Sequence, residues 1–233
     1  VGVARSGLTP AAILAKHLHL PIDVLRQSKA DTIDLGHGFR LNKRGTGKTL
    51  LVDDTVMTGS SLKKTKAILN EEVITAVIYA NPARASMVDY YSRLLPHPHL
   101  LEWNLFNSTF LPGCMFDMDG ILCEDCPPNL DDDGHKYIDW MKHVKPKHLV
   151  RKSPINIVTA RLKKYKAETL DWLHSWGIQV KTLTMGPWES KAERSKVDVG
   201  AWKGRHFADF LHSPSMSMDP LMFIESDPSQ AQR

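Results

Sequence analysis

Short apolar runs alternate with amphipathic helical patterns along most of this chain, and that alternation limits the possible folds more than any other feature. We expect strands over residues 49–53, 73–80, 100–106, 113–116, 155–159, 180–184 and 221–224. We expect helices over residues 10–19, 60–70, 85–95, 137–143, 163–176 and 199–211. Strands that alternate with helices form parallel sheets from β-α-β units. The sequence therefore predicts an α/β fold in which mainly parallel sheets are flanked by helices.

The sequence predicts that the chain has two domains. Its 233 residues are enough for two small domains. A Pro-Gly pair lies within Leu111–Gly113, between two sets of strands and helices. We therefore expect two Rossmann-like domains, over residues 1–110 and 111–233.

The amino-acid composition bears on the location and the partners that we expect for this chain. No apolar run approaches the roughly 18 residues that span a bilayer, so we expect no membrane partner. Three cysteines do not supply a disulfide framework, and the expected location is a reducing cytoplasm. The net charge of +4 suits anionic substrates without indicating nucleic-acid binding.

An acidic pair, Asp53 and Asp54, follows one predicted strand and leads into a turn rich in hydroxyl groups. The turn and the helix start after it contain Thr55, Thr58, Gly59, Ser60 and Ser61. Main-chain N–H groups at a helix start, joined by hydroxyls, bind phosphate, and a glycine lets the backbone approach the ligand. The carboxylates can accept hydrogen bonds from sugar hydroxyls or hold a metal ion through water. Helix capping alone would explain one of the serines but not the whole set.

The stretch VDDTVMTGSSL resembles the phosphoribosyl pyrophosphate (PRPP) loop of type I phosphoribosyltransferases. The sequence VGVARSGL at residues 1–8 resembles the pyrophosphate loop of the same family, and the resemblance covers about residues 1–106. It implies that Asp53 and Asp54 contact the ribose hydroxyls and that residues 55–61 bind the 5-phosphate. It also implies that Arg5 and Ser6 face the pyrophosphate.

The same resemblance bears on two further segments. Residues 28–48 are rich in glycine and basic side chains and fall where the family carries its mobile catalytic loop. The family usually has further structure ahead of its first loop, so we expect the first domain to be incomplete at its amino end. Base recognition is not readable from this chain.

A second acidic motif, Asp117-Met118-Asp119-Gly120, follows the apolar residues 114–116. At a strand end, two carboxylates separated by one residue can face one ligand, and Gly120 lets the chain turn away. Beside a magnesium ion, Asp117 can attack phosphorus and form an aspartyl-phosphate. The carboxyl group of Asp119 can protonate the leaving oxygen and then activate water. A calcium site or a capped turn are the structural alternatives for such a pair.

Three later features favour the phosphate chemistry. Thr159 ends an apolar strand, Lys203 begins an apolar helix, and Glu225 and Asp227 follow the last predicted strand. A hydroxyl can hold a phosphoryl oxygen, a lysine can neutralise the charge that develops on the transferred group, and carboxylates can bind magnesium.

This series resembles the haloacid dehalogenase-like (HAD) phosphohydrolases over about residues 112–233. The resemblance implies that Asp117 is the nucleophile, that Asp119 is the general acid and base, and that Thr159 binds phosphate. It implies a Mg²⁺ site made by Asp117, the main-chain carbonyl of Asp119, and Asp227 with or without Glu225. The catalytic lysine is one of Lys191, Lys196 and Lys203, of which we favour Lys203 because its distance to the final strand fits best.

The segment between Gly120 and Ile155 is long enough for a small cap only. An open site of this kind admits bulky substrates such as nucleotides. The stretch around Arg161, with the lysines after it, somewhat resembles polynucleotide-end phosphatases of the superfamily, although those lysines also fit a solvated helix face. A nucleic-acid end is thus the less favoured substrate. Asp131, Asp132 and Asp133 read as an exposed acidic loop.

The leading hypothesis is a bifunctional enzyme of nucleotide metabolism, with a PRPP-dependent phosphoribosyltransferase-like half and a magnesium-dependent phosphatase half. The expected partners are a phosphorylated small molecule such as a nucleotide, and PRPP or pyrophosphate. The alternative is a phosphatase that is regulated by a non-catalytic domain sensing PRPP or a nucleotide. The oligomeric state is not readable from the sequence.

Overall fold

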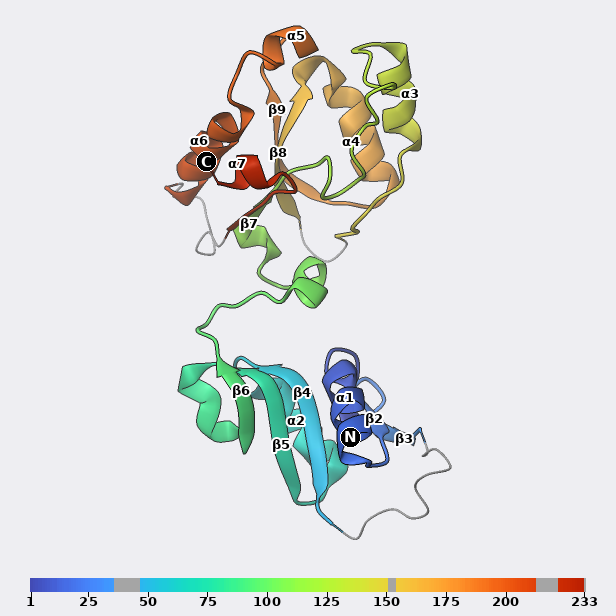
Figure 1. Cartoon of the computed structure of the whole chain (residues 1–233), viewed down its shortest axis with the longest axis vertical. Coiled ribbons are helices and arrows are strands. Elements are labelled where there is room, and N and C mark those ends of the chain that lie inside the picture. The colour runs from blue at the N-terminus through green and yellow to red at the C-terminus, as the bar shows by residue number, and fades with distance from the viewer. Residues whose placement is uncertain (36–46, 151–153, 213–221, 233) are drawn as a thin grey trace. The chain divides into compact units, whose positions relative to one another are not determined.

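The chain forms two compact units, residues 1–103 and 104–233, and each is described by itself (Figure 1). The computed structural model describes residues 1–35, 47–150, 154–212 and 222–232. Each unit contains a mainly parallel sheet flanked by helices, so the predicted α/β class is confirmed. Within the described residues, no helix is long and apolar enough to cross a membrane.

The amino-terminal unit is built on a six-stranded sheet in the order β3-β2-β1-β4-β5-β6. Its strands are β1 (Gly2–Val3), β2 (Asp23–Arg26), β3 (Asp31–Asp34), β4 (Thr49–Val56), β5 (Val73–Ala80) and β6 (Tyr90–Leu94). Every pairing is parallel except that of β2 with β3. The chain order runs outward from β1 on one side and from β4 on the other, so the strand order reverses between β1 and β4. In open α/β sheets, ligands bind at the carboxyl ends of the strands beside such a reversal.

Two helices cover this sheet, α1 (Leu8–Leu18) and α2 (Ser60–Leu69). Helix α1 packs on β1 and β4, where Ala11 lies so close to Gly2 that a Cβ on that glycine would be 2.7 Å from the Ala11 Cβ. Helix α2 contributes the buried Leu62 to a core that also contains Leu51 and Val77. The 3₁₀ helix η1 (Pro82–Met87) follows β5 and leads into β6.

The carboxy-terminal unit has a four-stranded sheet, all parallel, in the order β10-β7-β8-β9. Its strands are β7 (Cys114–Phe116), β8 (Ile155–Leu162), β9 (Val180–Gly186) and β10 (Met222–Ile224). The chain proceeds from β7 to β8 to β9 and then returns to the other side of β7 with β10. The strand order therefore reverses beside β7, which is the strand that carries the second acidic motif.

The larger helices lie on the two sides of this sheet, with α3 and α4 on one side and α6 on the other (Figure 1). Their bounds are α3 (His135–His143), α4 (Lys166–Ser175) and α6 (Val199–Leu211). The shorter helices are η2 (Glu102–Asn107), η3 (Leu111–Gly113), η4 (Lys163–Tyr165), α5 (Lys191–Arg194) and α7 (Pro228–Ala231). Aromatic residues dominate the core, where Tyr137 packs on Tyr165 and Trp188 packs on Trp202.

Two predicted elements are wrong. Residues 85–95 form the end of η1 and strand β6 instead of a helix. The Asp89 carboxylate accepts hydrogen bonds from the Thr75 main-chain N–H (2.8 Å) and hydroxyl (2.7 Å), which holds this segment against β5 as a strand. Residues 100–106 contain η2 instead of a strand. In both places, tertiary contacts override the local pattern.

Candidate active sites

The first candidate site lies at the carboxyl ends of β1 and β4, on either side of the strand reversal. The loop 4–7 leaves β1 and packs against β4 so closely that a Cβ on Gly7 would be 2.6 Å from the Val52 carbonyl oxygen and 2.8 Å from the Asp53 Cα. Only a glycine fits there. The structure therefore brings together the two motifs that the sequence separates by about 45 residues. The exposed Arg5 lies in this loop, next to Ser6.

The acidic pair occupies the end of β4. Asp54 is buried, and its Oδ2 accepts a hydrogen bond from the exposed Trp103 indole Nε1 at 2.9 Å. The Asp53 Oδ1 accepts the Asp54 main-chain N–H at 2.9 Å. Burial raises the pKa of Asp53 to about 7, and the charge of Asp54 acts in the same direction. Two adjacent carboxylates kept partly out of water are an acceptor for hydroxyl donors.

The hydroxyl-rich turn runs into the start of α2. Gly59 has a φ of 80°, which a side chain would not tolerate, and no side chain caps the helix. Ser60 and Thr58 are exposed, and their hydroxyls lie 3.3 Å apart. Free N–H groups in the first turn of a ten-residue helix favour an anion.

Two other hydroxyls of the predicted set already have protein partners. The Thr55 hydroxyl lies 2.7 Å from His99 Nε2, and the Ser61 hydroxyl accepts a hydrogen bond from the Gln27 amide at 2.7 Å. The Asn81 amide donates to the Met57 carbonyl oxygen at 3.0 Å and so fixes the turn from the neighbouring strand. The part of the chain predicted as a mobile catalytic loop falls largely on residues 36–46, outside the described residues.

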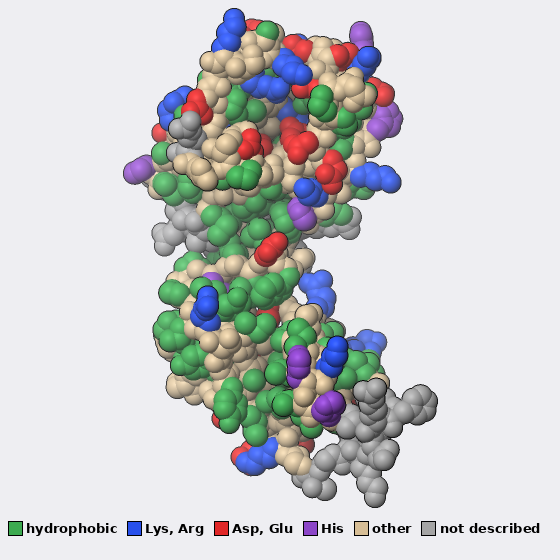
Figure 2. All heavy atoms as spheres, in the orientation of Figure 1, with side chains coloured by type: hydrophobic (Ala, Val, Ile, Leu, Met, Phe, Trp, Pro, Cys, Tyr) green, Lys and Arg blue, Asp and Glu red, His purple; other side chains and the backbone are tan. Residues whose placement is uncertain are grey.

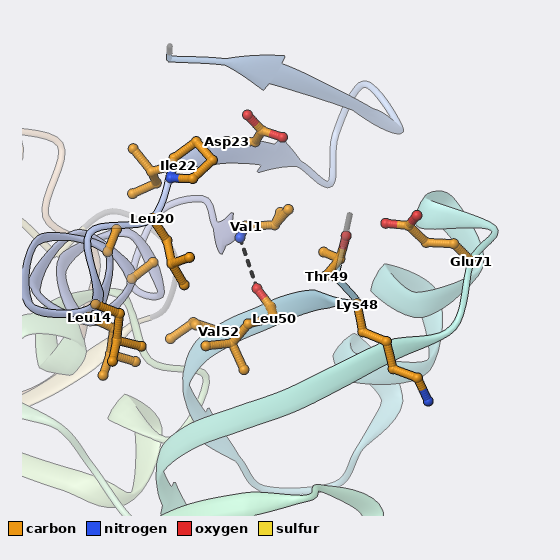
Figure 3. Close-up of a pocket in the computed structure, with 15 residues that line it drawn as sticks. Val1, Leu14, Leu20, Ile22, Asp23, Lys48, Thr49, Leu50, Val52 and Glu71 are labelled. Carbon is orange, nitrogen blue, oxygen red and sulfur yellow. Dashed lines mark hydrogen bonds between the residues drawn. The ribbon is translucent and has the colours of Figure 1, made fainter. Parts of the chain in front are cut away.

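A separate pocket of about 360 Å³ in this unit lies at the opposite ends of the strands (Figure 3). It is lined by the second half of α1 and by the start of β4, including Leu14, Leu18 and Leu50. Charged side chains are confined to a few positions, among them Lys48 and Glu71. Since the residues predicted to bind phosphate lie at the carboxyl ends of the strands, this pocket of mixed polar and apolar lining is not part of the candidate site.

The second candidate site is a buried charge cluster beside β7. The Lys203 ammonium lies 2.8 Å from Asp117 Oδ2 and 2.6 Å from Glu225 Oε2, and all three side chains are almost fully buried. The Asp117 main-chain N–H donates to the Ile224 carbonyl oxygen, which continues the pairing of β7 with β10. Helix α6 thus supplies the cation, and the ends of two neighbouring strands supply the carboxylates.

The cluster shifts the protonation of its members. Burial raises the pKa of Asp117 to about 7; Lys203 opposes this shift, and Glu225 and Asp119 add to it. Burial alone would lower the pKa of Lys203, but the charges and hydrogen bonds of Asp117 and Glu225 outweigh it and raise that pKa. Lys203 therefore stays protonated and compensates a pair of carboxylates that are otherwise poorly solvated.

The predicted lysines differ sharply in their surroundings. Lys203 is 2% exposed and contacts Asp117. Lys191 pairs with Asp131 at 2.7 Å and lies far more open to solvent, and Lys196 is exposed. Of the three, Lys203 is the one whose ammonium reaches the acidic motif.

Asp119 is held by a residue that the sequence pattern did not single out as a site residue. The fully buried Arg161 donates to both Asp119 carboxylate oxygens through Nε, at 3.0 and 3.1 Å, and to Oδ1 through Nη2 at 2.6 Å. Arg161 lies two positions after Thr159 on β8, and its main-chain N–H donates to the Thr159 hydroxyl at 3.2 Å. Thr159 is fully buried and is not among the residues that line the pocket.

The turn after Asp119 packs against the loop after β10. Gly120 has a φ of 78°, and a Cβ there would be 2.2 Å from the Ser226 hydroxyl oxygen. That hydroxyl donates to the Asp119 main-chain oxygen at 3.3 Å. Asp227 lies in the same pocket, but its carboxylate accepts hydrogen bonds from Ser229 and Gln230 and caps α7.

One pocket of about 680 Å³ is lined by Asp117, Asp119, Lys203, Glu225, Ser226 and Asp227. Figure 2 shows acidic side chains gathered on the corresponding face near α7. Among the described residues, no three His, Cys, Asp or Glu side chains alone form a metal site. The predicted magnesium set relies instead on the main-chain oxygen of Asp119, which has only a weak hydroxyl partner. The donors are all oxygen atoms and carry excess negative charge, a chemistry that fits Mg²⁺.

The aspartates at 131–133, expected to form an exposed acidic loop, have structural roles. Asp131 pairs with Lys191, and Asp133 accepts a hydrogen bond from the Tyr165 hydroxyl at 2.9 Å. The Asp132 carboxylate accepts three main-chain N–H groups at the start of α3. Together they connect the segment before α3 to η4 and α5.

Comparison with known proteins gives a match for the amino-terminal part. Residues 1–110 match the model of the phosphoribosyl transferase domain family. A solved structure, a purine phosphoribosyltransferase from Pyrococcus horikoshii Ot3, is 23% identical over 43% of this chain and 76% of that one, with a TM-score of 0.29. A score that low supports no statement about fold or activity. The family match ends at residue 110, so the role of the carboxy-terminal unit rests on its own residues.

The buried cluster predicts a large stability difference between two lysines. Lys203→Met leaves Asp117 and Glu225 buried without their cation and should lower the free energy of unfolding by about 3–5 kcal/mol. Lys191→Met removes a half-exposed ion pair and should cost about 1 kcal/mol or less. Urea unfolding followed by tryptophan fluorescence measures both, because five of the six tryptophans lie in the carboxy-terminal unit. Equal losses for the two variants would contradict the assignment of Lys203 as the buried cation.

Proposed function

We propose that this chain joins a domain that binds PRPP to a magnesium-dependent phosphatase that acts through an aspartyl-phosphate. The match of residues 1–110 to the phosphoribosyl transferase domain family supports the first half of this proposal. Which ligand it takes and the activity of the second unit are our inference. The observation that carries the phosphatase is the buried contact of Lys203 with Asp117, at the strand end where the sheet reverses its order.

In the proposed reaction, an Asp117 carboxylate oxygen attacks the phosphorus of a phosphomonoester. The bond from phosphorus to the leaving oxygen breaks, and that oxygen takes a proton from Asp119. Lys203 neutralises charge on the transferred group, because its ammonium already lies against the attacking carboxylate. A low-dielectric surrounding strengthens this interaction.

The second step releases phosphate. Asp119, now without its proton, takes one from a water molecule, and that water attacks the phosphorus of the aspartyl-phosphate and restores the Asp117 carboxylate. Arg161 fixes the position of Asp119 through its hydrogen bonds and is itself locked by burial. Asp119 retains some exposure to the pocket, with 27% of its side chain accessible, so it can exchange protons with water.

Magnesium would be held by the Asp117 carboxylate, the main-chain oxygen of Asp119 and the carboxylates of Glu225 and Asp227, which line the same pocket. When bound, the ion would favour the ionised form of Asp117 and polarise the phosphoryl oxygens. Both carboxylates already have protein partners, because Glu225 pairs with Lys203 and accepts two main-chain N–H groups, and Asp227 caps α7.

In the first unit, we propose that PRPP binds at the carboxyl ends of the strands. The uncapped start of α2 would bind the 5-phosphate, with the exposed hydroxyls of Thr58 and Ser60. Asp53 and Asp54 would accept the ribose hydroxyls, and the loop with Arg5 and Ser6 would face the pyrophosphate. A nucleotide made or split here would be a natural substrate for the phosphatase unit.

Asp117→Asn should abolish phosphate release from a panel of nucleotides and sugar phosphates in the presence of Mg²⁺. The amide cannot attack phosphorus, and its loss of charge weakens the contact with Lys203. Asp139→Asn, on the exposed face of α3, is the matched control and should leave release unchanged. Calorimetric PRPP binding by Asp117→Asn should be unaffected. Phosphate release that survives Asp117→Asn would disprove the nucleophile assignment.

Gly7→Ala should weaken PRPP binding by about tenfold or more, because its Cβ would collide with the backbone of β4 and push the loop away from Asp53. Gly134→Ala in the carboxy-terminal unit, where a Cβ would meet nothing closer than 3.6 Å, is the control and should bind normally. Isothermal calorimetry measures both. Identical affinities would remove the loop from the PRPP site, whereas binding without any pyrophosphate-dependent turnover would favour a sensing domain.

A further inference from the structure

One phenol in the phosphatase pocket has no protein partner. Tyr137, on α3, lines the pocket and is only 6% exposed, with its ring packed on Trp140 and Tyr165. Its hydroxyl makes no hydrogen bond to any described residue. The ring is buried, but the hydroxyl oxygen is not fully enclosed and borders the pocket, where it can donate a hydrogen bond to a ligand or to water. The position of this group therefore indicates a contact with a ligand in the pocket.

The Tyr137 ring stacks on Trp140, and the guanidinium of Arg161, which binds Asp119, lies over the Trp140 ring, so Tyr137 lies on the Asp119 side of the pocket. Burial raises the pKa of the phenol, and Asp119 is the strongest of the charges that act on it, so the hydroxyl keeps its proton and is a donor. In the proposed reaction, Asp119 delivers a proton to the leaving oxygen. A donor close to Asp119 is thus placed to contact the leaving group rather than the transferred phosphoryl group.

Arg194 contributes a cation to the same pocket. It ends the short helix α5, and its Nη1 donates to the Ala160 carbonyl oxygen at 3.3 Å. Its Nη2 lies 3.8 Å from Asp131, beyond hydrogen-bond distance, and Asp131 is already paired with Lys191 at 2.7 Å. Most N–H donors of Arg194 are therefore not used within the described part of the chain. By contrast, both close partners of Lys203 are carboxylates.

We propose that Tyr137 and Arg194 form a leaving-group subsite, and that the phosphatase prefers phosphomonoesters whose leaving group carries a second anionic group. A guanidinium with free donors binds a phosphate through paired, charge-assisted hydrogen bonds. The phenol hydroxyl adds a neutral donor to an oxygen of the same leaving group. This inference rests on the proposed phosphatase function and names its substrate class.

The test compares kcat/KM for matched pairs of substrates with the full-length chain and Mg²⁺. One pair is a nucleoside 3′-monophosphate and the corresponding 3′,5′-bisphosphate, and the other is a sugar monophosphate and the corresponding bisphosphate. We expect the bisphosphate to be preferred in at least one pair, and the pair that shows it identifies the nucleoside or the sugar as the leaving group. Arg194→Ala should lower that preference by about tenfold, mainly through KM.

Further variants separate a specific contact from a structural effect. Arg194→Lys keeps the charge and should restore only part of the preference, because it lacks the planar pair of donors. Tyr137→Phe keeps the packed ring and should raise KM for the preferred ester. Arg205→Ala, on the exposed face of α6, should leave the preference unchanged. A structural role for Arg194 would instead lower kcat/KM equally for both members of each pair.

Binding alone gives a second readout. In the inactive Asp117→Asn chain, calorimetry should show tighter binding of the preferred bisphosphate than of its monophosphate, and adding Arg194→Ala should remove the difference. Activity without a preference in either pair overturns this inference alone and leaves the phosphatase intact. A preference lost in Lys147→Ala but kept in Arg194→Ala also overturns it, because Lys147 lines the same pocket. Absence of phosphatase activity on every ester overturns both the inference and the proposed function.

Discussion

The buried ammonium of Lys203, held between Asp117 and Glu225, is the contact on which the second unit depends. It joins α6 to the ends of β7 and β10, so it fixes the edge of the sheet at which the pocket opens. Without that cation, the two buried carboxylates would be desolvated with no compensating charge. Loss of Lys203 would therefore destabilise the whole cluster. The same contact that holds these elements together places a cation beside the proposed nucleophile, and stability and chemistry therefore share one group.

Both sheets share one topological feature, a reversal of strand order. In each sheet the strand order reverses beside the strand that carries an acid pair, at β1 and β4 in the first unit and at β10 and β7 in the second. Loops on the two sides of a reversal separate and leave room for a ligand at the carboxyl ends of the strands. A glycine then permits close packing on each side, Gly7 against β4 and Gly120 against Ser226. The two units thus meet the same constraint with unrelated loops.

The sequence carries the acid pairs, the α/β class and most of the strands, because these depend on local patterns and on residues adjacent in the chain. The order of strands in a sheet cannot be predicted from local sequence patterns. Asp117 and Glu225 are more than 100 residues apart in the sequence, so only the fold shows that they lie together. Arg161 lies between an apolar strand and a run of lysines, and no local pattern reveals that it binds Asp119. Tyr137 and Arg194 lie on separate helices, α3 and α5, and only the fold brings them to one pocket. Residues 85–95 have a helical pattern, but Asp89 anchors them to β5 as a strand.

The central claim is that Asp117 becomes phosphorylated during turnover. Its most direct test is acid quenching of the full-length chain during steady-state hydrolysis of a labelled ester with Mg²⁺, followed by peptide mapping. The account predicts a label that hydroxylamine removes, located on the peptide that contains Asp117 and chased away by excess unlabelled ester. Rapid phosphate release with no label on that peptide, under conditions that trap acyl phosphates, would contradict it.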